Sequence, residues 1–273
     1  MMLSIGLIQT NTGIEPAIEA ERLAAQIGEA AAKGAEIIFT PEMSGLLDRD
    51  RARAAGKIRH ETDEIVLAAV RTAAARHNVW VHLGSLALQG TGNKFVNRGF
   101  LIDSNGEITA RYAKIHLFDV ALGTESWRES AAYDAGEEAV VAATPWGALG
   151  LTICYDVRFP ALHRALAQAG AAMIAVPAAF TRPTGQAHWH VLLRARAIET
   201  GCWVIAAAQT GEHADGRATY GHSVVISPWG EVVLDMGEAP GIGIAHIDMA
   251  AVAAARGKVP ALEHARRFRV VAP

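Results

Sequence analysis

The sequence predicts an α/β fold in which two β-sheets pack face to face and helices cover both outer faces, a four-layer αββα sandwich. Short apolar runs alternate along the chain with alanine-rich segments of helical period, which is typical of α/β proteins. Two segments of the first half also recur in the second half, in the same order. We therefore expect an internal pseudo-twofold repeat in which each half contributes one sheet and its covering helices.

The first recurring segment pairs residues 34–42 with residues 170–178, each an apolar strand followed by proline. The second pairs residues 100–108 with residues 224–232, each a strand, a turn that contains glycine, and a return strand. Such local patterns can arise independently in unrelated α/β proteins. Finding both in the same order favours a true repeat.

The individual elements follow from the same pattern in chain order, because short apolar runs suit strands and longer alanine-rich segments suit helices. We expect strands at 3–9, 35–40, 79–86, 96–103, 107–113, 147–153, 171–177, 202–208, 222–227, 231–235 and 242–247. We expect helices at 16–33, 61–77, 159–169, 187–200 and 248–256.

The composition indicates one globular domain. The chain has 273 residues, and hydrophobic residues make up 51% of it, enough for a large core. No linker rich in proline or serine divides the alternating segments, so we expect a single domain over residues 1–273. The formal net charge is −3 and no segment clusters lysine and arginine with aromatic residues, so we expect no nucleic-acid partner.

The sequence also favours a soluble, cytoplasmic protein. Residues 1–9 lack the basic segment of a secretory signal peptide. No window approaches the roughly 18 uninterrupted apolar residues of a membrane-spanning helix, so no membrane partner is expected. The two cysteines, Cys154 and Cys202, offer no disulfide framework, which favours a reducing compartment.

Cys154 has the sequence context of a nucleophile. It ends the apolar run 148–153 and precedes the segment 155–160, a pattern that predicts a strand, a sharp turn and a helix. A side chain at such a corner lies at the carboxyl edge of a sheet, where the next helix can stabilise a thiolate. The alternative is a buried structural cysteine. Cys202 lies within an apolar strand with no turn after it, and we expect it in the core.

Glu42 and Lys114 also follow predicted strands. Glu42 interrupts the first repeat, because the second half has Ala178 at the equivalent position. A carboxylate directly after a buried strand is costly unless it has a partner or a task, although an exposed loop glutamate is the alternative. Lys114 lies among apolar residues, whereas most lysines are solvated at the surface. Because α/β sheets place their sites at strand ends, we expect Glu42, Lys114 and Cys154 to lie together.

These three residue types complete one another chemically. A carboxylate can take the thiol proton, the thiolate can attack a carbonyl carbon, and an ammonium with a backbone N–H can hold the oxyanion. The carboxyl group can then protonate the leaving amine and activate water to cleave the thioester. The sequence therefore predicts amide hydrolysis through an acyl-enzyme. Cys154 is the predicted nucleophile, Glu42 the general base and acid, and Lys114 with the Tyr155 N–H the oxyanion donors.

In these segments the chain resembles the nitrilase, or carbon-nitrogen hydrolase, superfamily, in which a Glu-Lys-Cys triad occurs in this order. The matching segments are 40–42, 114–119 and 154–160. The resemblance covers essentially the whole chain. It implies a four-layer αββα sandwich, in agreement with the repeat, a small-molecule amide substrate, and a homodimer or higher homo-oligomer.

Further segments resemble the branch of small amidases related to deaminated glutathione amidase and omega-amidase. These segments are 187–189, 192–200, 220–223 and 228–230. The resemblance implies deaminated glutathione as the expected substrate, with 2-oxoglutarate and cysteinylglycine as products. The alternatives are an omega-amidase acting on 2-oxoglutaramate, a hydrolase of other small amides or carbamoyl amino acids, and a catalytically silent scaffold of the same fold.

The resemblance also implies a further acidic residue that helps to position the lysine and the substrate. Glu129 is the best match, and Glu125 competes with it because the intervening loop varies in length. Arg158, Phe180 and Arg182 lie near motifs that could bind substrate. Structural ion pairing or core packing would explain each of these three equally well.

One position departs from the family pattern. Relatives usually carry glutamate after the pair His188-Trp189, whereas this chain has His190. His188 and His190 are two residues apart on a predicted helix and point to different faces, so they make a poor metal site. No other group of His, Cys, Asp or Glu has ligand spacing along the sequence, and we expect no metal and no cofactor.

Overall fold

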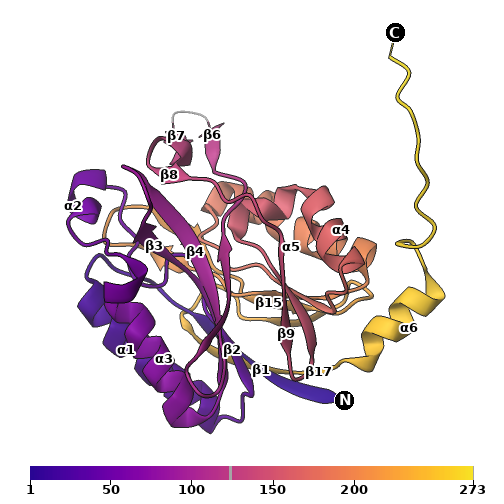
Figure 1. Cartoon of the computed structure of the whole chain (residues 1–273), viewed down its shortest axis with the longest axis horizontal. Coiled ribbons are helices and arrows are strands. Elements are labelled where there is room, and N and C mark those ends of the chain that lie inside the picture. The colour runs from indigo at the N-terminus through magenta and orange to yellow at the C-terminus, as the bar shows by residue number, and fades with distance from the viewer. Residues whose placement is uncertain (123–124, 273) are drawn as a thin grey trace.

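The first half of the chain and the last long strand build one β-sheet (Figure 1). The computed structural model describes residues 1–122 and 125–272. The strand order is β17-β1-β2-β3-β4-β5, and β8 pairs with β4 at one side. The strands are β1 (Met2–Gln9), β2 (Ile37–Phe39), β3 (Trp80–Gln89), β4 (Phe95–Ile102), β5 (Ile108–Ala113), β8 (Tyr133–Asp134) and β17 (Gly241–Asp248).

The second half builds the other sheet, with the strand order β16-β15-β12-β11-β10-β9. Its strands are β9 (Val140–Thr144), β10 (Gly147–Leu151), β11 (Met173–Ala175), β12 (Trp203–Ala206), β15 (Val224–Ile226) and β16 (Val232–Asp235). Two separate hairpins complete the strands: β6 (Asp119–Leu122) with β7 (Glu125–Arg128), and β13 (Thr210–Glu212) with β14 (Ala218–Tyr220).

The two sheets share one topology, which confirms the predicted repeat. In the first sheet β1, β2 and β3 are parallel, and β4 and β5 follow in antiparallel pairing. In the second sheet β10, β11 and β12 are parallel, and β15 and β16 follow in the same way. The segments paired in the sequence, 34–42 with 170–178 and 100–108 with 224–232, contain β2 and β11 and the two equivalent hairpins.

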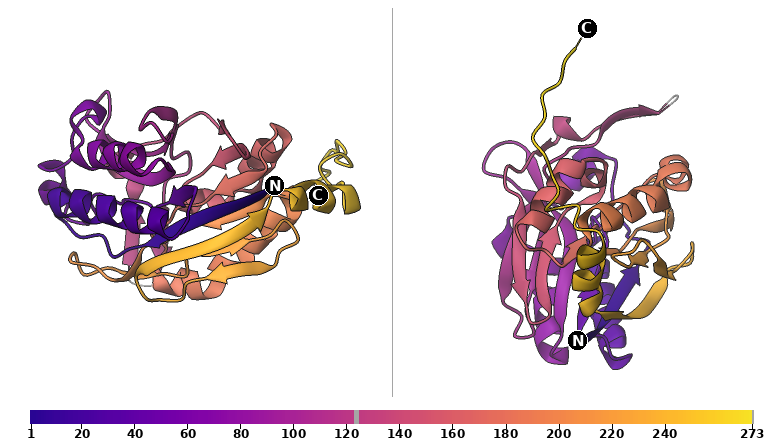
Figure 2. Two further views of the ribbon diagram at one scale, coloured as in Figure 1. Left: turned by 90° about the horizontal axis from the view of Figure 1, so that it is seen from below. Right: turned by 90° about the vertical axis from the view of Figure 1, so that its right-hand side faces the viewer.

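Helices cover the outer faces of both sheets. Figure 2 shows the indigo and purple helices of the first half and the orange helices of the second half on opposite sides of the paired sheets. Among the described residues, no helix is both long and apolar enough to cross a membrane. The helices are α1 (Pro16–Ala32), α2 (Arg51–Ala55), α3 (Ile65–His77), α4 (Pro160–Gln168), α5 (Arg182–Thr200) and α6 (Ala250–Lys258), with 3-10 turns η1 (Glu61–Asp63), η2 (Glu129–Ala131) and η3 (Cys154–Arg158).

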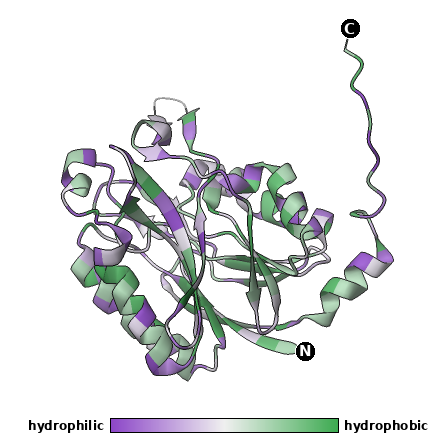
Figure 3. Cartoon of the chain, viewed as in Figure 1, coloured by the Kyte–Doolittle hydropathy of each residue, from purple (hydrophilic) through white to green (hydrophobic). Residues whose placement is uncertain are grey.

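The alternation of side chains along a strand explains the four layers. Leu3, Ile5 and Leu7 of β1 join the apolar cluster between the two sheets, while Ile8 joins the cluster under α1 and α3. Apolar colouring accordingly runs along the strands of both sheets (Figure 3). The predicted αββα sandwich is therefore confirmed.

The structure differs from the predicted elements mainly at short segments and boundaries. Helix α5 begins at Arg182 rather than at 187, because Pro183 lies in its first turn, where a missing N–H costs nothing. The predicted helix 61–77 divides into η1 and α3. The prediction missed α2, β8, β9 and the hairpins β6–β7 and β13–β14, which are too short to show a clear apolar period.

The segment after α6 extends away from the two sheets to the C-terminus (Figure 1). Three of its apolar side chains, Phe268, Val270 and Val271, are more than four-fifths exposed. An extended segment with exposed apolar side chains gains little from contact with its own chain. It is available to contact another molecule.

Candidate active site

The ends of three strands bring Glu42, Lys114 and Cys154 together. Glu42 follows β2 and Lys114 follows β5, both in the first sheet, whereas Cys154 follows β10 in the second. All three residues are buried, with exposed fractions of 4%, 2% and 7%. The site therefore lies where the two sheets meet, as the strand-end argument predicted.

Glu42 is held by several donors and is not an exposed loop residue. Its Oε1 accepts hydrogen bonds from the Lys114 ammonium at 2.8 Å and from the Asn97 amide at 2.9 Å. Its Oε2 accepts one from the Ala179 N–H at 2.9 Å. Ala179 belongs to the second half of the chain, so both sheets fix this carboxylate. The prediction missed Asn97, whose only signal was a polar residue within an apolar strand.

Lys114 lies between two carboxylates. Besides the bond to Glu42, its Nζ donates to Glu129 Oε2 at 2.9 Å and to Oε1 at 3.2 Å. Glu129 is held in turn by the Phe118 N–H, which donates to Oε2 at 2.6 Å. An ammonium has three N–H donors and these three acceptor atoms engage them, so a substrate oxygen would take the place of one of the two bonds to Glu129. Glu129 thus has the position expected of the additional acid, while the side chain of Glu125 lies outside the described residues.

The charges in this cluster stabilise one another. Burial raises the pKa of the Glu42 carboxyl, but the charge and hydrogen bond of Lys114 outweigh burial and hold that pKa below its usual value. Burial lowers the pKa of Lys114, and the charges of Glu129 and Glu42 more than reverse that effect, so the pKa lies well above its usual value. Glu42 is therefore a carboxylate and Lys114 an ammonium at neutral pH.

Cys154 occupies a sharp turn between β10 and η3. Its φ of 48° lies in the left-handed region, which is unfavourable for a residue with a side chain. The Cys154 N–H donates to the Pro177 carbonyl at 2.8 Å, which fixes the turn against the end of β11. The predicted strand, turn and helix are thus present, although the segment after the cysteine is a 3-10 turn and α4 begins only at Pro160.

The Cys154 side chain is a neutral thiol in this arrangement. Burial raises the pKa of the thiol, the Glu42 charge raises it further, and Lys114 opposes the shift only in part, so the pKa lies well above its usual value. The expectation that a helix terminus stabilises a thiolate is therefore not met. The geometry instead suits a carboxylate that takes the thiol proton as the reaction proceeds.

A buried carboxylate supports the turn that carries Cys154. Asp156 accepts hydrogen bonds from the Tyr112 hydroxyl at 2.7 Å and from the Ile153 N–H at 2.8 Å. It also contacts His116, through its N–H at 3.0 Å and its Nδ1 at 2.7 Å. These contacts tie the turn to β5 and to the segment after it. They fix the position of Cys154 relative to Lys114.

The cluster opens into a cavity of about 740 Å³. Its lining includes the side chains of Glu42, Lys114, Glu129 and Cys154, together with Tyr155. No acceptor for the Tyr155 N–H is found among residues 1–122 and 125–272, so this donor is available beside the cysteine. A carbonyl oxygen bound near Cys154 could receive this N–H, together with an N–H of Lys114 that exchanges one of its bonds to Glu129.

The other predicted binding residues fall into two groups. Phe180 and Arg182 line the cavity. Arg158 does not belong to the lining; its guanidinium stacks over the rings of Tyr155 and Phe180, at 5.9 and 5.4 Å from their centres. The structure therefore favours a packing role for Arg158 over contact with substrate.

Four further arginines near the cavity were not singled out from the sequence. Arg49, Arg51, Arg128 and Arg217 line it beside Arg182. They come from three separate parts of the chain, so no local motif could have shown that they converge. Cys202, in contrast, is fully buried as expected, and its thiol donates to the Ala171 carbonyl at 3.2 Å.

Known proteins share both the sequence and the fold. The family model for carbon-nitrogen hydrolase matches residues 5–257. Deaminated glutathione amidase from Synechocystis sp. is 42% identical over 254 residues, which cover 90% of each chain. The human deaminated glutathione amidase is 41% identical, over 88% of this chain and 75% of the human protein.

Solved structures agree with this comparison. The C. elegans NitFhit protein superimposes with a TM-score of 0.90 at 37% identity, and the match covers 97% of this chain and 65% of that one. An amidase from Nesterenkonia sp., with acrylamide added at its active site cysteine, superimposes with a TM-score of 0.78 at 25% identity, over 94% of this chain and 98% of that one. The chain therefore belongs to the carbon-nitrogen hydrolase family and is a hydrolase of carbon-nitrogen bonds in amides.

Proposed function

We propose that this protein is a cysteine-dependent amidase that hydrolyses deaminated glutathione to 2-oxoglutarate and cysteinylglycine. One observation carries the proposal: the cluster of Glu42, Lys114 and Cys154 opens into a cavity of about 740 Å³ with several arginines in its lining. The name of the Synechocystis relative, at 42% identity, supports the same substrate.

The charges around the cavity support an anionic substrate. Arg49, Arg51, Arg128 and Arg182 form no ion pair with a carboxylate of the described residues, whereas Arg217 pairs with Asp215 at 2.7 Å. Guanidinium groups bind carboxylates well, often through two hydrogen bonds. Deaminated glutathione carries a carboxylate at each end, whereas 2-oxoglutaramate carries only one. Deaminated glutathione can therefore pair its two carboxylates with more of the cavity's arginines than 2-oxoglutaramate can with its one.

The proposed mechanism begins with transfer of the Cys154 thiol proton to Glu42 as Sγ attacks the amide carbon. Lys114 and the Tyr155 N–H hold the oxyanion of the tetrahedral intermediate. Glu42 then gives its proton to the departing amine of cysteinylglycine, and the C–N bond breaks to leave a thioester. Glu42 next takes a proton from water, which attacks the thioester carbon. Return of that proton to Sγ releases 2-oxoglutarate and restores the thiol.

The test is to measure kcat/KM of the purified protein for deaminated glutathione and for 2-oxoglutaramate. We expect deaminated glutathione to be preferred by about tenfold or more, because only its cysteinylglycine part can add binding in the transition state. Equal or reversed preference would instead identify an omega-amidase. The Cys154→Ala variant should lose turnover of both substrates, and substantial residual activity would overturn the proposed mechanism.

We also propose that the enzyme acts in the cytoplasm as a homodimer. Val191 and Ile198 are exposed by 68% and 55% and lie seven residues apart, on one face of α5. The exposed apolar side chains after α6 provide a second surface for a partner copy. Cys154 and Cys202 are both free thiols, which is compatible with a reducing compartment.

A further inference from the structure

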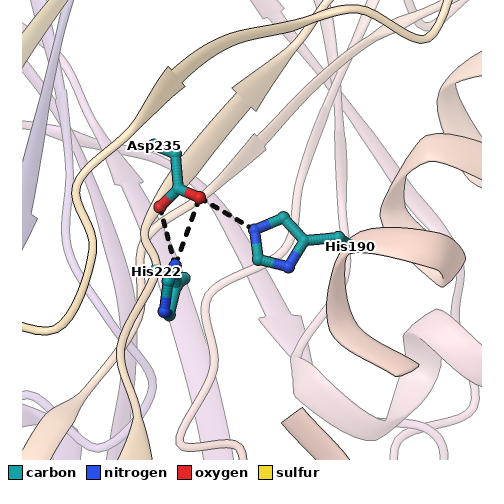
Figure 4. Close-up of side chains that lie close together, drawn as sticks. All are labelled: His190, His222 and Asp235. Carbon is teal, nitrogen blue, oxygen red and sulfur yellow. Dashed lines mark hydrogen bonds and ion pairs between the residues drawn. The ribbon is translucent and has the colours of Figure 1, made fainter. Parts of the chain in front are cut away.

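His190, His222 and Asp235 form a cluster outside the catalytic residues described above (Figure 4). The Nε2 atom of His190 lies 2.9 Å from Asp235 Oδ2. The Nδ1 atom of His222 lies 2.9 Å from Asp235 Oδ1 and 3.1 Å from Oδ2. All three donor groups lie within 4.8 Å of one another. They come from α5, from the loop after β14 and from the end of β16.

The surroundings fix the orientation of these ligands. His222 has a φ of 55°, in the left-handed region, and its N–H donates to the Gly237 carbonyl at 2.7 Å. Its carbonyl accepts the Trp189 indole N–H at 2.8 Å, and the Tyr220 ring stacks on the imidazole with centres 4.4 Å apart. Asp235 Oδ1 accepts the Gly237 N–H at 2.9 Å. Supporting contacts of this kind orient the ligands of metal sites in proteins.

We propose that His190, His222 and Asp235 bind a divalent transition-metal cation, with Zn²⁺ the best fit. Two imidazoles and one carboxylate are a typical donor set for zinc. Ligands of a tetrahedral zinc ion lie about 3.3 Å apart, since each bond is about 2.0–2.1 Å long. The Asp235 oxygens lie 2.9 Å from each imidazole nitrogen, so these two pairs require only a small outward adjustment. Water completes the coordination at the open position.

The side chains are accessible enough for the ion to enter. Their exposed fractions are 29% for His190, 21% for His222 and 33% for Asp235. The bound ion would join α5 to the second sheet. The ion would lie outside the catalytic cavity, whose lining does not include these three residues.

The spacing of residues along the chain does not reveal these ligands, and for that reason no metal was expected from the sequence. His188, the neighbour considered there, contacts Arg158 at 3.2 Å instead. His222 and Asp235 lie 32 and 45 positions after His190 in the sequence. Only the packing of α5 against the β14–β15 loop and β16 brings the three together.

The experiment is a titration of ZnCl₂ into chelator-treated protein that carries Cys154→Ala, which removes the active-site thiol as a competing ligand. Calorimetry should show one zinc ion bound per chain, and the Tm should rise by about 5 °C when free zinc reaches about 100 times Kd. His190→Ala and Asp235→Asn should each weaken zinc binding by about 100-fold or more. His246→Ala, which removes an exposed histidine of β17, is the matched control and should leave binding unchanged.

The outcomes separate the proposal from ordinary surface binding. Loss of zinc binding in both ligand variants, with the control intact and Mg²⁺ without effect, supports the site, because Mg²⁺ prefers oxygen ligands. No zinc binding, or binding that survives both substitutions, overturns it and leaves a hydrogen-bonded His-Asp-His cluster. Because the titration measures zinc rather than turnover, its result is independent of the proposed amidase substrate.

Discussion

At the scale of single residues, the site depends on how buried charges compensate one another. Lys114 is 2% exposed and contacts both Glu42 and Glu129, so one cation serves two carboxylates. Removing one member of such a cluster leaves uncompensated buried charge, which costs far more than losing an exposed ion pair. The ion cluster therefore affects both stability and the protonation of the proposed base.

We expect Lys114→Met to lower the free energy of unfolding by about 3–5 kcal/mol, because Glu42 and Glu129 then face each other without a cation. The matched control is Lys94→Met, which removes a half-exposed lysine that lies 3.7 Å from Asp134. The control should cost about 1 kcal/mol or less. Urea unfolding monitored by circular dichroism measures both values, and equal losses would contradict this account.

The pH dependence of kcat/KM should show a broad plateau. The pKa of Glu42 is held below its ordinary value of 4.5, so the base stays ionised until the pH falls below that value. The pKa of the Cys154 thiol is raised above its ordinary value of 9.0, so the thiol stays protonated until the pH rises above that value. Activity should therefore fall only outside this interval. A steep rise near neutral pH would indicate a thiolate instead.

At the scale of the elements, the ends of β2 and β11 must approach closely where the sheets meet. Gly84 of β3 lies at this seam, and a Cβ added there would be 2.1 Å from the Thr40 carbonyl oxygen and 2.5 Å from the Pro177 Cβ. Thr40 precedes Glu42 by two residues, and the Pro177 carbonyl accepts the Cys154 N–H. A small side chain at position 84 would thus displace the base and the nucleophile together.

We expect Gly84→Ala to destabilise the protein by about 1–3 kcal/mol through overpacking and to lower kcat. The control is Gly257→Ala in α6, where an added Cβ would meet no atom within 4 Å among the described residues, apart from its chain neighbours and the backbone of its own helix. That substitution replaces glycine within a helix, so it should be neutral or slightly stabilising. Denaturation midpoints and steady-state rates of both variants provide the check. An unchanged kcat in Gly84→Ala would show that packing at position 84 does not control the positions of Glu42 and Cys154.

At the scale of the whole molecule, the exposed apolar face of α5 is expected to mediate self-association. Light scattering should give about twice the 28.9 kDa mass of one chain. Val191→Glu should shift the protein toward monomer, because it introduces charge into the proposed interface. Ile18→Glu, at a similarly exposed position on α1, should leave the mass unchanged. A monomeric mass for the unaltered chain would refute the homodimer.

Apolar periodicity, turn residues and the likeness of the two halves were enough to predict the repeat, the αββα layers and the three residues at strand ends, because each of these follows from the order of residue types along the chain. Which side chains meet depends on packing between distant segments. The contact of Asn97 with Glu42, the convergence of the arginines and the cluster at His190 all join residues far apart in the chain. The protonation of Cys154 depends on packing too, since burial beside a carboxylate raises the pKa of a thiol and cannot be inferred from spacing along the chain.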